Sequence, residues 1–378
     1  MPTNKNSTIL HLIDTTGPGG AETIFTQLAH ASRSNSIDSI ALVRGRGWVF
    51  DELKKLGIKT YIKDCKGSFN YHYLFYLIKL IRRKKVNLIQ SHLLGSNVYG
   101  SLAGILTFTP VISTFHGIVD ISPNEKYRWL KLLIIYFGSF RVIAVTELLK
   151  LELQKHGFTK FGSPTDVIQN GIDTEKFNLG KKTLSSLDKE SISLGCLGNV
   201  RPAKNYSLAL DFLRFLRTQN INATLTIAGD DTNELAKQLK KEVVELKLEK
   251  SVHFKGFIDD SALFLSEIDI FLMTSLSEGH PLALNQAISS AVPVITTPSG
   301  VEKIFDRGLI FVSNSHTIEG LAECFTNLRL LSKDQLKTRM VAGRNFIVQN
   351  YGISTMCNQY LDLYRQASRS LIVKDKKC

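Results

Sequence analysis

The chain has 378 residues, more than one hydrophobic core usually organises, so its length predicts two domains. Hydrophobic residues make up 43% of the chain and charged residues 21%, a balance that excludes an intrinsically disordered protein. The formal net charge is +13. The first 180 residues hold 22 of the 47 basic side chains but only 13 of the 34 acidic ones. This half of the chain therefore favours an anionic partner such as phosphates, an acidic membrane or nucleic acid.

Short β-branched or apolar runs alternate with longer helix-like stretches through the first half of the chain. This alternation predicts βαβ units and a parallel sheet whose faces are covered by helices. A turn signal, Asn170-Gly171, follows the last run. The predicted strands are Thr8–Ile13, Ser39–Val43, Val86–Ile89, Val111–Thr114, Val142–Val145 and Asp166–Gln169.

A glycine-rich loop, Asp14–Glu22, joins the first predicted strand to the first helix and contains Gly19 and Gly20. Glycines let backbone N–H groups approach a phosphate, and a helix N-terminus favours an anion. The spacing matches neither G-x-G-x-x-G nor a Walker lysine motif. The loop therefore fits both a phosphate site and a plain strand-to-helix turn.

Two segments of the first half, Tyr71–Lys85 and Glu125–Phe137, combine aromatic and aliphatic bulk with cations. Such segments can lie on an anionic bilayer, where each cation near the surface contributes about 1 kcal/mol. Each segment alone is better explained as a sheet-covering helix with basic ends. Together, and with the positive charge of this half, they favour contact with an anionic membrane surface.

Two histidines stand at the ends of predicted strands, His92 after one and His116 after the next. The carboxyl ends of parallel strands are where doubly wound folds bind their ligands. His116 opens a loop in the run Thr114-Phe115-His116-Gly117, which favours a functional role over a structural one. His92 fits a ligand-binding role and an ordinary structural role equally.

A polar stretch without apolar periodicity, Leu179–Ser191, is the predicted linker, and the strand–helix alternation restarts after it. We predict a Rossmann-like domain at 1–180, a second one at 190–352, and a C-terminal segment at 353–378 whose helix can cross back to the first domain. The site is expected in the cleft between two such domains. The later predicted strands are Ile192–Leu197, Ala223–Ala228, Val252–Lys255, Ile268–Met273 and Val292–Thr296, and the final helix is Ser354–Arg369.

Arg201 and Lys204 follow the first strand of the second half, in the run Gly198–Asn205. Arginine offers a planar fork of donors and lysine a point charge, and both suit a pyrophosphate. Neutralising a departing diphosphate matters because the transition state builds charge on it. The alternative is a pair of solvated cations at the start of a helix.

The segment Ser275–Ala287 carries the most information, because it follows an apolar strand and enters a helix. Gly279 permits a sharp turn, Pro281 suits the first helical turn, and the following amides can face an anion or a sugar oxygen. Glu278 can accept hydrogen bonds from sugar hydroxyls. In the alternative interpretation Glu278 is a helix-start acid and Gln286 is a surface residue.

These motifs together resemble glycosyltransferase family 4, whose members are retaining enzymes with the GT-B fold, two Rossmann-like doubly wound domains facing each other across a cleft. Each motif alone is modest evidence, but five of them occur in the family's order. They are Gly19–Glu22, Thr114–Gly117, Val167–Asp173, Gly198–Lys204 and Glu278–Leu282.

The resemblance implies a role for each motif, with His116 and Glu278 as the catalytic residues. His116 would reach the donor sugar and diphosphate from the first domain, and Glu278 would contact hydroxyls of the donor sugar. Arg201 and Lys204 would hold the diphosphate. Residues 190–352 would form the donor-side domain and residues 1–180 the acceptor-side domain, in which His92 would either meet the acceptor or be structural. The other implied donor-binding residues are Gly19, Gly20, Gly279, His280, Pro281, Leu282, Ala283 and Gln286.

The chain departs from the family pattern at two positions. Gln286 stands where the family usually has a second glutamate that holds the ribose. Glutamine still donates and accepts hydrogen bonds but carries no charge, so we expect activity with weaker donor binding. Asn199 stands where many members have an arginine after the glycine, and Arg201 is expected to take over.

The implied reaction moves a sugar from a nucleoside diphosphate sugar to a hydroxyl of a cell-surface glycan, with a lipid-linked acceptor expected. The departing phosphate would help to deprotonate the incoming hydroxyl, so no protein nucleophile is needed. No Asp-x-Asp triplet occurs, so neither a metal nor another cofactor is expected. The alternatives are a nucleotide-sugar epimerase, a phosphorylase, and a noncatalytic glycan-binding or co-activator relative; no nucleic-acid module is recognisable.

The sequence also bears on location. Five scattered cysteines without a C-x-x-C pair suggest free thiols and a reducing compartment rather than disulfides or zinc. No signal peptide is expected in the polar segment Met1–Ser7. The most apolar stretch, Leu132–Phe140, is shorter than the roughly 20 residues that span a bilayer. We therefore expect a cytoplasmic protein that can bind the inner face of the plasma membrane.

Overall fold

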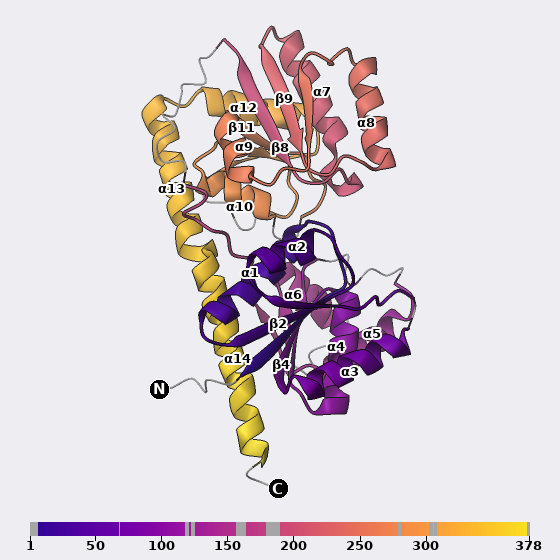
Figure 1. The fold of residues 1–378 in the computed structure, drawn as a ribbon. Helices are drawn as coiled ribbons and strands as arrows, with labels where there is room; N and C mark the ends of the chain where they lie inside the picture. Colours follow the sequence, from indigo (N-terminus) through magenta and orange to yellow (C-terminus); the bar gives the residue numbers. More distant parts are fainter. Residues whose placement is uncertain are drawn as a thin grey trace. The chain divides into compact units, whose positions relative to one another are not determined.

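The computed structural model describes residues 7–67, 69–117, 121, 125–155, 164–178, 190–278, 281–301, 305 and 308–375, with side chains to 368 (Figure 1). The chain divides into two compact units. The first combines Met1–Gly171 with Ser354–Cys378, and the second is Ile172–Ile353. The predicted linker lies outside the described residues over 179–189.

The first unit is built on a seven-stranded parallel sheet in the order β3-β2-β1-β4-β5-β6-β7. The order reverses direction between β1 and β4, as in a doubly wound fold. The strands are β1 Thr8–Ile13, β2 Asp38–Val43, β3 Lys59–Ile62, β4 Val86–His92, β5 Val111–Phe115, β6 Arg141–Ala144 and β7 Thr165–Val167. The helices are α1 Gly20–Ser34, α2 Trp48–Lys55, α3 Tyr71–Arg83, α4 Leu94–Thr107, α5 Arg128–Gly138, α6 Glu147–Lys155 and α14 Ile353–Asp375.

The central strand β1 shows why the sheet is buried on both faces. All six of its residues are buried, which is typical of a parallel strand covered by helices on each side. Leu10 and Leu12 pack into one apolar cluster with residues of α3 and α4. Ile13 packs into another with Phe25 and Ala29 of α1. The period of two along the strand thus sends alternate side chains to separate cores.

The second unit repeats the plan with a six-stranded parallel sheet in the order β10-β9-β8-β11-β12-β13, and its order reverses between β8 and β11. Its strands are β8 Ile192–Leu197, β9 Ala223–Ala228, β10 Val252–Gly256, β11 Ile270–Met273, β12 Val294–Thr296 and β13 Phe311–Val312. Its helices are the 3-10 helix η2 Pro202–Lys204, α7 Tyr206–Thr218, α8 Glu234–Glu245, α9 Ser261–Glu267, α10 Leu282–Ser289, α12 Ile318–Arg329 and α13 Lys333–Tyr351.

Two Rossmann-like α/β units are therefore present, which confirms the predicted fold class. The two sheets contain short strands that the sequence analysis did not anticipate, β3 and β13, each at an edge of its sheet. α14 belongs to the first unit although it follows the whole second unit in sequence. Within the described residues, no helix is both long enough and apolar enough to cross a membrane.

Candidate functional site

The loop after β8 in the second unit depends on a glycine. Gly198 has φ +147°, and a Cβ there would lie 2.9 Å from Cε of Lys204, so a side chain would be strained and would displace the lysine. The Tyr206 hydroxyl donates to the Gly198 carbonyl over 2.7 Å. This contact holds the turn closed at the point where η2 begins.

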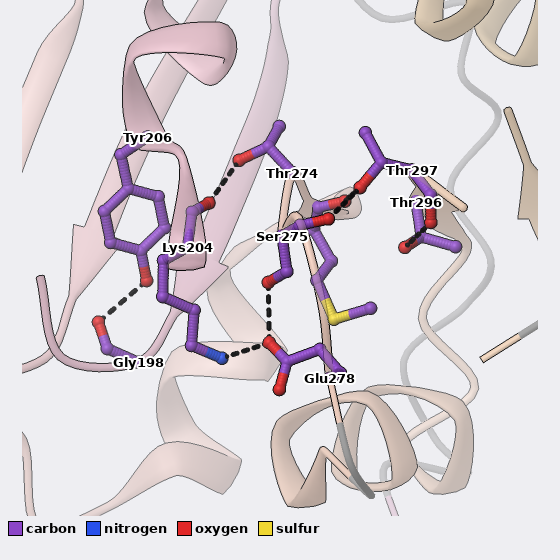
Figure 2. Close-up of polar contacts among 9 residues, drawn as sticks. Gly198, Lys204, Tyr206, Thr274, Ser275, Glu278, Thr296 and Thr297 are labelled. Carbon is purple, nitrogen blue, oxygen red and sulfur yellow. Dashed lines mark hydrogen bonds and ion pairs between the residues drawn. The ribbon is translucent and has the colours of Figure 1, made fainter. Parts of the chain in front are cut away.

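Lys204 and Glu278 form an ion pair between the loop after β8 and the loop after β11. Lys204 Nζ lies 2.7 Å from Glu278 Oε1, and Ser275 Oγ donates to the same oxygen over 2.6 Å (Figure 2). The side chains are only 20% and 14% exposed. A carboxylate oxygen that accepts two hydrogen bonds at this burial is held in one orientation.

The backbone ties the same two loops together. Thr274 Oγ1 donates to the Lys204 carbonyl over 2.9 Å, and the Leu276 N–H donates to the Ala203 carbonyl over 2.8 Å (Figure 2 shows the Thr274 bond). The Glu278 N–H donates to the Ser299 carbonyl, which follows β12. The ends of β8, β11 and β12 therefore hold one preorganised polar cluster.

The Glu278 carboxylate has one oxygen left for a ligand. Both of its side-chain contacts fall on Oε1, and among the described residues none donates to Oε2. Arg201, at the start of η2, is exposed, and its guanidinium has no partner in the described part of the chain. One cation at these strand ends is thus paired and one is unpaired.

Asn199, at the position where the resemblance leads one to expect arginine, has a structural role. Its Oδ1 accepts from the Asp230 N–H over 3.0 Å and so ties the β8 loop to the end of β9. The residue thereby supports the loop rather than supplying a charge.

The helix α10 begins directly after the Glu278 loop. Pro281 is its N-cap residue, Leu282 and Ala283 form its first turn and are half-buried, and Gln286 lies half-buried in the next turn. The predicted donor-binding residues Gly279 and His280 lie outside the described residues. Among the residues that the structure describes, no group of three His, Cys, Asp or Glu side chains is placed to hold a metal ion.

In the first unit, Gly19 is the N-cap residue of α1 and Gly20 its first residue. A Cβ on Gly19 would lie 2.3 Å from Oε2 of Glu22, so the helix's own carboxylate folds over its N-terminus. A carboxylate near a helix N-terminus is itself stabilised by the helix dipole. Phosphate binding by Gly19 and Gly20 therefore stays a prediction, and it would have to displace Glu22.

His92 and His116, which the sequence analysis assigned to different partners, lie in contact with each other. His92 Nδ1 is 2.8 Å from His116 Nε2. His92 is buried and His116 half-buried. Burial lowers the pKa of His116 to about 3 and the pKa of His92 well below its usual range, so both rings are neutral.

Sequence reasoning missed several polar residues that support these side chains. Ser275 was noted only as part of a segment, although it donates to Glu278. Gln90 and Thr114 lie on β4 and β5, beside the histidines, and contact two tyrosines of α14. The only available signal was the placement of polar residues inside otherwise apolar strand runs.

Comparison with known proteins gives two family matches. A model described as "Glycosyltransferase Family 4" matches residues 18–176, and a model described as "Glycosyl transferases group 1" matches residues 191–329, so together they span well over half of the chain. The matches cover the greater part of both units.

Relatives and solved structures agree with these matches. The chain is 26% identical over 333 residues to an Escherichia coli UDP-Gal:alpha-D-GlcNAc-diphosphoundecaprenol alpha-1,3-galactosyltransferase, covering 80% of each chain. It is 24% identical over 290 residues to the capsular polysaccharide biosynthesis glycosyltransferase CapH of Staphylococcus aureus, covering 74% of this chain and 78% of CapH. The fold is similar to that of Anabaena Alr3699/HepE in complex with UDP and glucose, with a TM-score of 0.82 at 19% identity over 95% of this chain and 100% of the other.

Proposed function

The chain belongs to glycosyltransferase family 4 and has the GT-B fold, and on this premise we propose that it is a retaining, nucleotide-sugar-dependent transferase that acts on a lipid-linked glycan of the cell envelope. The observation that carries the proposal is the cluster at the ends of β8, β11 and β12. There Lys204 and Glu278 form an oriented ion pair, and Arg201, exposed and without a partner among the described residues, stands three residues before Lys204.

The cluster supplies what transfer from a nucleoside diphosphate sugar needs. Arg201 would bind the diphosphate through its free guanidinium, and Lys204 has further N–H donors beside the one that Glu278 accepts. Glu278 Oε2 would accept from a hydroxyl of the donor sugar. Cations that are already in place stabilise the leaving diphosphate without reorganisation.

In the proposed mechanism the bond between the anomeric carbon and the diphosphate oxygen breaks as the acceptor hydroxyl attacks from the same face. The departing phosphate oxygen takes the hydroxyl proton, so the configuration is retained and no side chain acts as nucleophile. The protein orients the two substrates and stabilises the charge. This role agrees with a pair of histidines whose low pKa makes them poor bases.

The acceptor is proposed by comparison. The Escherichia coli relative is named for a diphosphoundecaprenol-linked acceptor, and CapH for capsular polysaccharide biosynthesis.

Incubation of the protein with a panel of nucleotide sugars and extracted envelope lipids is expected to release nucleoside diphosphate only when both substrates are present. UDP sugars are the first donors to test, because UDP is bound in the similar HepE structure. If NMR shows an α-linked product from an α-linked donor, the result supports retention. Conversion of the nucleotide sugar without any acceptor indicates an epimerase. No transfer with any pair of nucleotide sugar and lipid argues against the proposal.

Membrane contact is proposed for the surface formed by α3 and α5, both of which pack against α4 in the first unit. Tyr71 and Phe75 of α3 are 65% and 72% exposed, and Trp129 and Phe137 of α5 are 70% and 63% exposed. Exposed cations accompany them on and beside these helices: Lys79, Arg82, Arg83, Lys85 and Lys126. Exposed aromatic rings beside cations are typical of a surface that binds anionic lipid.

The protein is expected to pellet with vesicles that contain about one third anionic lipid at low salt, and to be released as salt rises. Trp129→Ser combined with Phe75→Ser should reduce the pelleted fraction severalfold. Leu330→Ser, which removes an equally exposed apolar side chain in the second unit, should leave it unchanged. Recovery of the wild-type protein in the supernatant under all conditions would argue against a membrane-binding surface.

Gln286 offers a test of donor binding. We expect Gln286→Glu to lower the KM for the nucleotide sugar by about three- to tenfold with little change in kcat, because a charged acceptor binds ribose hydroxyls more strongly than an amide. Initial rates over a range of donor concentrations measure the change. Gln238→Glu, on the exposed face of α8, is the matched control. A higher KM in Gln286→Glu would show that this position does not face the ribose.

A further inference from the structure

Two tyrosines of α14 reach the sheet of the first unit and contact polar residues in its core. Tyr364 donates its hydroxyl hydrogen to Gln90 Oε1 over 3.2 Å, across 274 positions of sequence. The Tyr360 hydroxyl lies 3.2 Å from Thr114 Oγ1. All four side chains are buried. The C-terminal helix is therefore fastened to β4 and β5 by specific hydrogen bonds as well as by apolar contact.

The Gln90 amide has a defined orientation. Its Nε2 lies 2.9 Å from Thr114 Oγ1 and 3.4 Å from the Ser91 carbonyl oxygen, which can only accept. The amide nitrogen must therefore face this side and the amide oxygen must face Tyr364. The Tyr364 hydroxyl stabilises that orientation by donating to the oxygen.

The Gln90 orientation determines where His92 carries its proton. Gln90 Nε2 is 3.2 Å from His92 Nε2. A protonated ring nitrogen there would place a hydrogen against the hydrogens of the amide, so His92 Nε2 must present its lone pair. A neutral imidazole has one N–H, and the His92 proton is therefore on Nδ1.

The same logic extends to His116. His92 Nδ1 lies 2.8 Å from His116 Nε2, and the two ring planes differ by only 20°. The nitrogens are much closer than the ring centroids, which are 5.1 Å apart, so the rings meet edge to edge, as an in-plane N–H donor requires. His92 donates and His116 Nε2 accepts, which leaves the His116 proton on Nδ1.

We propose that Tyr364 and Gln90 are positioning residues that fix the tautomers of His92 and His116, so that His116 contacts the donor substrate through a protonated Nδ1. Held in this way, His116 acts toward substrate as a hydrogen-bond donor and not as a base. The catalytic part of this inference rests on the proposed function, because it places His116 at the donor. The tautomers themselves are independent of it.

The tautomers can be measured on the full chain without substrate. In protein labelled with ¹⁵N-histidine, two-bond ¹H–¹⁵N correlation spectra distinguish Nδ1–H from Nε2–H rings, and the variants His92→Gln and His116→Gln assign the signals. We expect both wild-type rings to be Nδ1–H. Tyr364→Phe should produce mixed or shifted signals for His92 and reduce kcat by about tenfold. This is the smaller end of the loss of activity seen when a residue that orients a histidine is removed.

Ser368→Ala is the matched control, since it removes a hydroxyl one turn away on the same helix that, among the described residues, contacts only the Tyr364 carbonyl and not Gln90 or Thr114. It should leave both tautomers and kcat within about twofold of wild type, and the Tyr364→Phe and Ser368→Ala variants should unfold at similar temperatures. Gln90→Glu should move the His92 proton to Nε2, because a carboxylate can only accept. A wild-type His92 with its proton on Nε2, or a Tyr364→Phe variant with unchanged spectra, would overturn the proposal. If the wild-type protein has both rings protonated on Nδ1 but shows no transferase activity, the proposed function is refuted and the inference about the tautomers still holds.

Discussion

Glu278→Gln is expected to reduce kcat/KM for the nucleotide sugar by about 100- to 1000-fold, the range seen when a preorganised polar group is removed from an active site. The amide that replaces the carboxylate can no longer neutralise Lys204, whose Nζ lies 2.7 Å from Oε1. Ser275 loses a charged acceptor at the same time. The oxygen that we propose binds the sugar and the position of the lysine would therefore both change.

Steady-state kinetics with the best donor measure this loss, and thermal unfolding checks that the fold persists. Glu249→Gln, an exposed carboxylate of the same unit, should retain wild-type kinetics. A double-mutant cycle with Lys204→Met adds a sharper test. Because the two side chains form a pair, the double variant should lose less than the sum of the single losses. Near-normal turnover in Glu278→Gln would show that the cluster does not serve the donor.

Arg201→Ala is expected to lower kcat/KM by about 10- to 100-fold, which corresponds to the roughly 1.5–3 kcal/mol of a hydrogen bond to a charged group. Arg201 is exposed and has no partner among the described residues, so its removal costs the fold little. The loss should appear as a weaker interaction with the diphosphate. Competitive inhibition by free nucleoside diphosphate should weaken in parallel.

Arg214→Ala, an exposed arginine of α7, is the control for loss of positive charge from the same unit. Arg201→Lys should recover part of the activity, since a point charge replaces only part of a planar fork. Unchanged kinetics and unchanged diphosphate inhibition in Arg201→Ala would exclude this residue from the donor site.

The pattern of alternating strands and helices was sufficient to predict both Rossmann-like units, because buried parallel strands give continuous apolar runs. β3 and β13 were missed for a physical reason. β3 lies at a sheet edge, and none of its residues is fully buried, so Lys59–Ile62 carries no apolar run. β13 has only two residues. Edge strands of this kind are defined by pairing with a neighbour, which sequence periodicity does not report.

The candidate site was only partly predictable. The order of the motifs was enough to predict that Arg201, Lys204 and Glu278 lie at strand ends. The pairing of Lys204 with Glu278 could not be predicted in this way, because it depends on the reversal of strand order that makes β11 the neighbour of β8. The contact between His92 and His116 likewise depends on register, since His92 pairs with Thr114 and His116 lies two residues beyond. Register is a property of the folded sheet.

The discontinuous first unit has a consequence for biosynthesis. Its sheet gains the covering helix α14 only after the whole second unit has been translated, because Tyr360 and Tyr364 follow that unit in the chain. A ribosome adds about 5–20 residues per second, so the buried face of β4 and β5 waits many seconds for its last partner. A nascent chain interrupted before α14 would leave that face without its covering helix.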